Sequence, residues 1–434
     1  YDKGWLRIMQ SVGYPSQNKS HFKSTDLYLT GNDGNSLLNG GDTGWIGRFM
    51  ELFYADLVVE TFPLAVEIGS NKTSLGFHAE EAHGLSLNIT GQDPAGFYSI
   101  LNGLGGAGPA NIPDSDYGRQ LEFINTTDTL SNTYAESISN AFNSGQNDVS
   151  YPDTDLADQL KTVARLIGGD LGSKVYMVRI SGFDTHNLQV QGVGDVLGKH
   201  HTLLDELSGA LDAFMNDIDS QNIADDVVGI TFSEFGRKAR ENGNFGTDHG
   251  EIAPMFVFGK PVAGGVSGIN PNLSEATDAN NYQIQTVQHD YRQTFATLLQ
   301  NFLGADDTII DATFFNHTLN ESFTDLKLDN LLKAEFKLDS ECFGGTLSTN
   351  TSENVKNWLV YPNPFRDTLN ISGIEDINSI TYRLYNSSGV LIVNKTGDIV
   401  NGKLSLNLVH LNSGVYIVEI LAGGKKEVHK VIKV

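Results

Sequence analysis

Cysteine, basic residues and long apolar runs are all scarce in this sequence of 434 residues. Its one cysteine, Cys342, excludes an internal disulfide but does not by itself assign the protein to the cytosol. No apolar run reaches the ~18 residues that a transmembrane segment requires, so none is predicted. The formal net charge of −24 argues against nucleic acid as a partner. It would also repel an anionic substrate unless a cation intervened, which favours a bound metal.

The sequence begins without a methionine and without a basic, apolar leader. It opens at Tyr1 and runs almost directly into Trp5–Val12, an apolar segment typical of a strand. We therefore expect a truncated start, which could lack a first strand and a signal peptide.

The length and the apolar content predict a globular chain of two or three domains. A hydrophobic content of 39% can form a sizeable core, and 46 glycines indicate many loops. From residue 155 onward, helical apolar periods alternate with short apolar runs such as Val175–Ile180, Val227–Phe232 and Pro254–Phe258. Connections of this length predict an α/β fold with a mostly parallel sheet flanked by helices.

A long amphipathic helix is predicted between Leu197 and Ile218, where apolar residues recur at steps of three and four. His201 lies on this apolar stripe, and we interpret it as a structural histidine of the core.

The composition changes after about residue 340. From Val360 onward the sequence contains only short alternating runs separated by turn formers, which predicts a small all-β sandwich. We expect an α/β domain at 1–345, a polar linker at 346–356 and the sandwich at 357–434.

Three stretches rich in acids and histidines follow or adjoin apolar runs: Phe183–His186, Ser233–Arg237 and Thr247–Gly250. Open α/β sheets bind their ligands where strands end. Aspartate and histidine are also common ligands of divalent metals. The three stretches are therefore candidate parts of one metal site.

Two pairs in these stretches are candidate metal ligands. On an extended backbone Asp184 and His186 point to the same side and could bind one ion; the alternative is a turn aspartate beside a surface histidine. Asp248 and His249 cannot face the same way on a strand. On an irregular, glycine-rich loop they could reach one ion or two; the alternative is a polar turn.

Glu234 and Arg237 flank a glycine just after a predicted strand. The fork of Arg237 suits a phosphate or sulfate group, although Arg240 could bind the anion instead. Glu234 could be a metal ligand, a general acid or base, or only the salt-bridge partner of Arg237. Ser20 could provide a nucleophilic hydroxyl at a helix start, but an N-cap role is the favoured alternative. Asp290 is expected to cap a further helix, and it could also orient a ligand.

Short motifs spread over roughly residues 1–305 resemble the DUF1501 family of exported bacterial proteins of unknown function. That family is similar to the alkaline phosphatase and sulfatase superfamily, whose metal sites use Asp and His at strand ends. The resemblance implies that Asp184, His186, Asp248 and His249 bind a divalent metal such as Zn, Ca or Mg. The matching motifs are Gly13–Pro15, Asn18–Phe22, Gly44–Arg48, Gly182–Asn187, Ser233–Arg237, Glu241–Gly243, Gly246–Gly250 and Asp290–Arg292.

The C-terminal strands resemble the type IX secretion sorting domain of Bacteroidota. The motifs that carry this resemblance are Val360–Phe365, Tyr385–Gly389, Leu411–Tyr416 and the basic end Lys425–Lys430. The resemblance implies that the type IX machinery is a partner. It also implies a secreted or outer-surface location in a Gram-negative bacterium.

Together these features predict an exported, metal-dependent hydrolase-like protein that would cleave a phosphate or sulfate ester. The metal would polarise the ester oxygen and activate Ser20 or a water, while Arg237 would bind the anion and Glu234 would assist. The alternative is a non-catalytic secreted or cell-surface binding protein that retains the hydrolase fold.

Overall fold

Contacts between residues divide the chain into two compact units, Tyr1–Ser340 and Glu341–Val434. The predicted linker, 346–356, lies outside the described residues, and the predicted domain boundaries stay predictions. The computed structural model describes residues 1–34, 43–57, 61–69, 74–79, 86–89, 115, 133–314, 327–338, 359–361, 365–366, 368–372, 379–386, 391–399, 403–411, 414–422 and 425–433.

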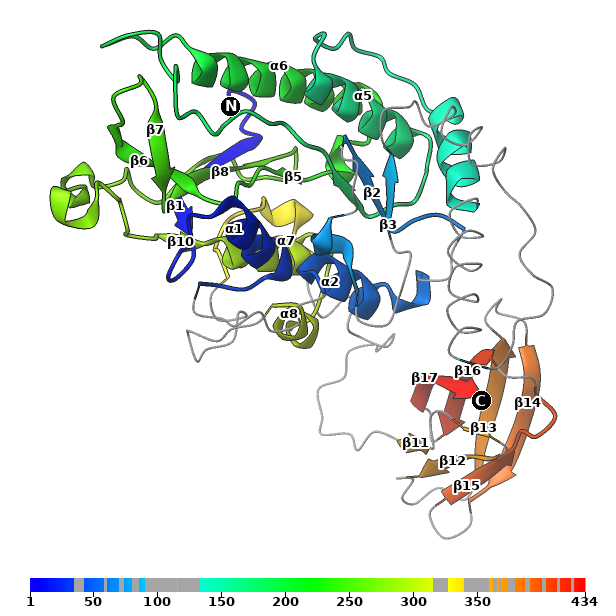
Figure 1. The fold of residues 1–434 in the computed structure, drawn as a ribbon. Coiled ribbons are helices and arrows are strands. Elements are labelled where there is room, and N and C mark those ends of the chain that lie inside the picture. The colour runs from blue at the N-terminus through cyan, green and yellow to red at the C-terminus, as the bar shows by residue number, and fades with distance from the viewer. Residues whose placement is uncertain are drawn as a thin grey trace. The chain divides into compact units, whose positions relative to one another are not determined.

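The main sheet of the first unit is mixed, which corrects the predicted mostly parallel arrangement. Its central strand β1 (Leu6–Gly13) pairs with β8 (Ala253–Phe258), β9 (Gly265–Ser267) and β10 (His289–Asp290), and β8 pairs with β5 (Gly229–Ile230) (Figure 1). β9 and β10 run parallel to β1, whereas β8 runs antiparallel to both β1 and β5. A continuous apolar run such as that of β8 suits a covered strand of either direction, so the pattern did not reveal its direction.

The first unit also contains two smaller sheets. One is parallel and places β2 (Ala65–Ile68) between β3 (Ser86–Ile89) and β4 (Val175–Met177). The other is the antiparallel pair of β6 (Gly236–Glu241) and β7 (Thr247–Gly250). The segment that follows β4 and the β6–β7 pair carry the acid- and histidine-rich motifs.

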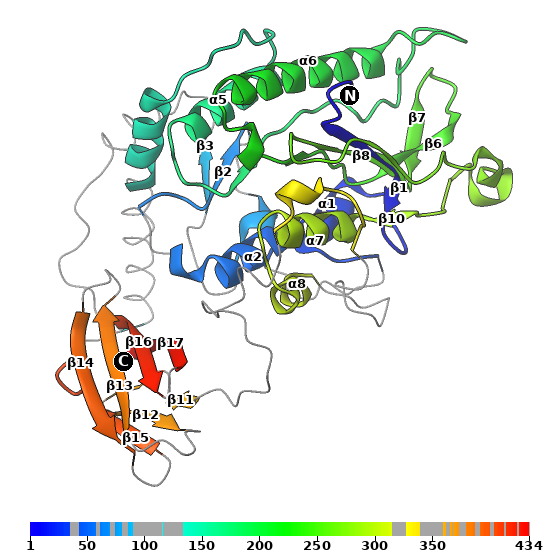
Figure 2. The same cartoon turned by 180° about the vertical axis from the view of Figure 1, so that it is seen from behind.

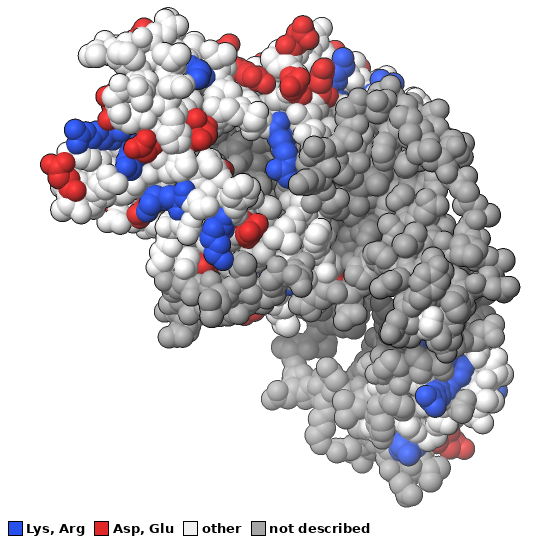
Figure 3. Space-filling view, in the orientation of Figure 1, with Lys and Arg blue, Asp and Glu red and all other residues white. Residues whose placement is uncertain are grey.

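Helices cover both faces of the strands, as the two opposite views show (Figures 1 and 2). The buried faces of helices and strands form two apolar cores, so the predicted α/β class is confirmed. Acidic side chains gather at the surface over two helices, Asp155–Gly168 and Lys199–Ser220 (Figure 3). Among the helices in the described ranges, none has the length and hydropathy that a bilayer crossing requires. α5 (Asp155–Gly168) and α6 (Lys199–Ser220) lie on one side, and α1 (His21–Thr30), α2 (Trp45–Phe53), α7 (Tyr291–Asn301) and α8 (Asp307–Thr313) lie on the other.

The long helix α6 is buried only in its C-terminal half. Its buried side chains lie between Ala210 and Ile218, in the core shared with α5. His201 and Leu204, in the N-terminal half, are exposed. The prediction that His201 occupies the core was therefore wrong, because the apolar stripe continues along α6 beyond the part of the helix that is covered.

The second unit consists of antiparallel sheets, as its alternating sequence predicted. One has the strand order β11-β12-β15 and the other β14-β13-β16-β17. Alternate residues such as Leu369, Ile371, Val418 and Ile420 come from both sheets and belong to one apolar core. The strands are β11 (Leu359–Tyr361), β12 (Thr368–Ser372), β13 (Ser379–Asn386), β14 (Leu391–Asp398), β15 (Lys403–Asn407), β16 (Gly414–Ala422) and β17 (Lys425–Lys433).

A fully buried arginine connects α7 to the loop that follows α1. The guanidinium of Arg292 donates to Asp290 Oδ2 at 2.7 Å and lies 3.4 Å from Asp33 Oδ2. Asp290 also caps α7, since its carboxylate accepts from the backbone N–H of Arg292, which confirms the predicted capping role. This buried ion pair therefore helps to fix α1 relative to the end of β10.

Arg292→Met should destabilise the first unit, because two carboxylates would stay in the core without their guanidinium. We expect the free energy of unfolding to fall by about 3–5 kcal/mol. Urea denaturation followed by the fluorescence of Trp45, which packs 4.5 Å from Phe295 of α7, measures the change. The matched Lys260→Met breaks surface pairs with Asp225 and Asp219 and should change little. Equal stability of both variants would contradict a structural role for the buried pair.

Candidate metal centre

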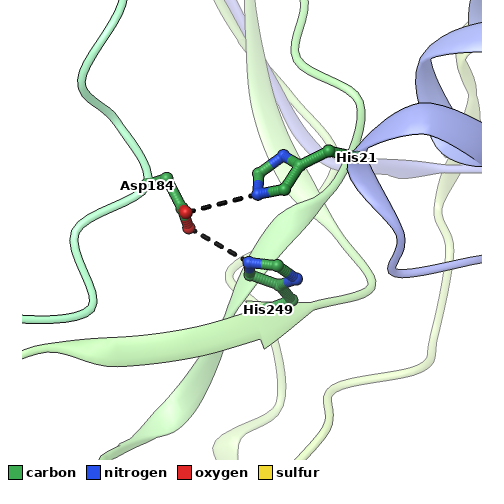
Figure 4. A group of neighbouring side chains, drawn as sticks. All are labelled: His21, Asp184 and His249. Atoms are coloured by element: carbon green, nitrogen blue, oxygen red, sulfur yellow. Dashed lines mark hydrogen bonds and ion pairs between the residues drawn. The ribbon is translucent and has the colours of Figure 1, made fainter.

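Three side chains from distant parts of the chain converge at one point of the first unit (Figure 4). His21 opens α1, Asp184 lies in the segment after β4, and His249 lies on β7. The Nε2 atoms of His21 and His249 are 3.2 and 3.1 Å from the carboxylate oxygens of Asp184. One ligand atom from each residue lies within 4.8 Å of the others, so the three could hold one metal ion. We refer to these residues as the His–Asp–His cluster.

Each imidazole of the cluster is oriented through its other ring nitrogen. Nδ1 of His249 is 2.8 Å from the backbone carbonyl of Lys19, which can only accept, so this nitrogen carries a proton. Nδ1 of His21 is 2.7 Å from Oε1 of Glu234 and donates to that carboxylate in the same way. Nε2 of each ring therefore faces Asp184 and can take either a proton or a metal ion. Such orientation through the distal nitrogen is characteristic of metal-ligating histidines.

Charges around the cluster favour an ionised carboxylate at its centre. The hydrogen bond with Glu234 raises the pKa of His21, and the charge of Asp184 adds to this effect. Burial alone would raise the pKa of Asp184, but the hydrogen bond from Arg237 and the charge of His186 hold it below its ordinary value. The carboxylate is therefore available as an anionic ligand.

Arg237, predicted to bind an anion, uses its guanidinium on groups of the protein. Nη1 donates to Oδ1 of Asp184 at 2.5 Å, and Nε donates to Oγ1 of Thr247 at 3.2 Å. Nη2 donates to the backbone carbonyl of Thr247. The hydroxyls of Thr185 and Thr247 both donate to Oε1 of Gln189, at 2.9 and 2.7 Å. Thr247 therefore fixes the guanidinium of Arg237, and the guanidinium in turn holds Asp184 in place.

The structure brings the first predicted ligand pair together but separates the second. Nδ1 of His186 is 2.9 Å from Oδ1 of Asp184. Asp248 instead contacts Lys238 at 3.4 Å and accepts from Asn242 at 3.2 Å. Because Asp248 and His249 are neighbours on the strand β7, they point to opposite faces, and of the two His249 contacts Asp184.

Ser20 and Glu234, the other predicted site residues, both adjoin the cluster. Ser20 is the N-cap residue of α1 by its position and extended backbone, but its hydroxyl makes no capping hydrogen bond. Its side chain is exposed beside His21. Glu234 pairs with His21, not with Arg237 as one alternative proposed.

Sequence reasoning did not assign a role to His21. The available signal was its place at a helix start just after the first strand, next to Ser20.

Phe235 lies against the cluster, with its ring 4.8 Å from that of His21 and 4.2 Å from that of His249. Phe235 therefore packs against both imidazoles and helps to fix their positions.

The comparisons with known proteins agree with both resemblances drawn from the motifs. Residues 135–310 match the family described as a protein of unknown function (DUF1501), and residues 359–434 match the secretion system C-terminal sorting domain. No curated protein matches the chain. The sorting domain indicates interaction with the type IX secretion machinery and a secreted or cell-surface location in a Gram-negative bacterium. The chain therefore contains a DUF1501 domain, which includes Asp184 and His249, and ends in a type IX secretion sorting domain.

Proposed function

We propose that the protein is an exported, metal-dependent hydrolase of phosphate or sulfate esters. The observation that carries this proposal is the His–Asp–His cluster. Two imidazole nitrogens are aimed at one ionised carboxylate, and the partner of each ring is already in place. A cluster that served only stability would not need both rings to present Nε2 to a single point.

The donor set fits zinc better than calcium or magnesium. Calcium and magnesium prefer oxygen ligands, whereas imidazole nitrogen suits zinc and related transition metals. Two histidines and one carboxylate are three protein ligands, the number that catalytic zinc sites use while they keep a position open. We therefore assign His21, Asp184 and His249 as the ligands, with His186 as a neighbour that contacts Asp184.

The chain's own residues divide the remaining tasks. When bound, the ion would polarise an oxygen of the phosphate or sulfate group. Glu234 and the carbonyl of Lys19 orient the two imidazoles, and Arg237 keeps Asp184 ionised. Ser20 presents an exposed hydroxyl beside His21 as the nucleophile. The backbone amides that open α1 favour an anion at the same place.

A matched pair of variants tests the ligand assignment. Asp184→Asn should weaken zinc binding at least about 100-fold, since even residues that only support a ligand contribute 10–100-fold. Asp248→Asn makes the same chemical change next to His249 and should leave the affinity within a factor of about three. Isothermal titration with zinc, together with elemental analysis of the purified protein, gives both values. Equal losses in the two variants would contradict the cluster and favour the ligand set predicted from the sequence.

Arg237→Lys separates the two roles considered for this residue. If Arg237 positions Asp184, zinc affinity should fall about 10–100-fold, because lysine cannot contact both Asp184 and Thr247 as the guanidinium does. If it binds the anion, KM should rise while zinc affinity stays unchanged, and the positioning role would be overturned. Arg240→Lys is the control, since Arg240 forms an exposed pair with Asp278 and lies over the ring of Tyr282.

Ser20→Ala tests the reaction itself. In a panel of aryl phosphates and aryl sulfates, we expect the zinc-loaded protein to turn over at least one substrate. The variant should lose about 100-fold or more in kcat and still bind zinc. Unchanged turnover in Ser20→Ala would exclude the serine as nucleophile. A wild-type protein that binds zinc and the anions without turnover would instead be a binding protein that retains the fold.

A further inference from the structure

Two loops next to residues of the candidate metal centre, one after Asp184 and one before His249, are bound to each other through their backbones. The N–H of Leu188 donates to the carbonyl of Asn244 at 3.1 Å, and the N–H of Val190 donates to that of Phe245 at 3.1 Å. A third bond runs from the N–H of Thr247 to the carbonyl of Thr185 at 3.2 Å. The loops 185–190 and 244–247 are therefore held together by three backbone hydrogen bonds, and we refer to this pair of loops as the rim.

This rim holds two large apolar side chains in an unfavourable backbone conformation. Leu188 has a φ of 51° and Phe245 a φ of 55°, in the left-handed region that residues with a Cβ rarely adopt. Their side chains are 52% and 39% exposed, so core packing does not offset the strain. Strained residues held by their surroundings often mark sites of binding or catalysis.

Both residues are close in the chain to residues that contact the candidate metal centre. Leu188 follows His186 by two residues, a span of at most about 7 Å. Phe245 precedes Thr247 by two residues, and Thr247 accepts two hydrogen bonds from Arg237.

The segment that follows Leu188 folds back on the same loop and extends the apolar surface. The N–H of Gln191 donates to the carbonyl of Leu197 at 2.7 Å, and that of Lys199 donates to Leu188 at 3.0 Å. Between these bonds, Val193 and Val196 are 97% and 78% exposed. Exposed apolar residues therefore stand in the segment that follows Asp184 and in the segment that precedes His249.

We propose that Leu188 and Phe245 form an apolar subsite that selects esters whose alcohol part is a large apolar group, such as an aryl or long alkyl group. This inference rests on the proposed function and specifies its substrate class. The phosphate or sulfate group would lie at the His–Asp–His cluster, and the organic group would cover the two exposed side chains. Small polar esters, such as glycerol phosphate, would lack this second contact.

Asparagine variants test the subsite because asparagine tolerates the left-handed conformation. Leu188→Asn and Phe245→Asn remove the apolar side chain and relieve backbone strain, so the melting temperature should stay equal or rise. In the zinc-loaded, full-length protein, kcat/KM for naphthyl phosphate or naphthyl sulfate should fall about 10-fold in each variant. The value for glycerol phosphate should change less than about twofold.

A binding measurement keeps this test independent of turnover. Anilinonaphthalene sulfonate combines an apolar aromatic group with an anion and is not an ester, so its fluorescence reports binding alone. We expect its affinity to fall about 10-fold in each variant. Leu52→Gln, which removes an exposed leucine of α2, is the control and should leave the affinity unchanged.

The possible outcomes distinguish this inference from the proposed function. Absence of zinc binding or turnover in the wild type would overturn the proposed function, and the probe would still test the subsite. Equal losses for naphthyl and glycerol esters, or an unchanged probe affinity, would overturn the subsite alone. A change of oligomeric state in sedimentation, without a change in probe binding, would show that the surface contacts a second copy and would also overturn it.

Discussion

The carboxylate of Asp184 is the group on which the candidate metal centre depends. One of its oxygens contacts His21, and the other contacts His249, His186 and Arg237. A single anion thus organises three imidazoles and a guanidinium that come from four different segments of the chain. In a protein with a formal charge of −24, the guanidinium of Arg237 and a cation held by the imidazoles are what would let an anionic ester approach.

The fold supplies the geometry that this carboxylate needs. The central strand β1 leads into α1, so His21 stands at a helix start, while the buried Arg292 fixes the loop at the other end of α1. The β6–β7 pair presents Arg237 and His249 as directly opposed residues on neighbouring strands. Rigid elements therefore position both imidazoles and the arginine, and only Asp184 relies on a loop, which Arg237 holds in place.

Features that depend on local sequence were predicted better than features that depend on tertiary contacts. The β strands of the C-terminal unit follow from alternation within each strand, and Asp184, His186 and His249 were proposed as ligands because their motifs stand next to apolar runs. The direction of β8 depends on its neighbours, and so does the pairing of β7 with β6, which turns Asp248 away from the cluster. His21 was missed because tertiary packing sets its distance from Asp184, and the local sequence around either residue does not reveal that distance.

X-ray absorption spectroscopy of the zinc-loaded protein is the most direct test of the central claim. A zinc ion held by the His–Asp–His cluster should have two imidazole nitrogens at about 2.0–2.1 Å and a carboxylate oxygen at a similar distance. The imidazole signal should fall to one ring in His21→Ala, because that histidine provides one of the two nitrogens. A coordination sphere made of oxygens alone, or one that does not change when His21 is removed, would contradict this claim.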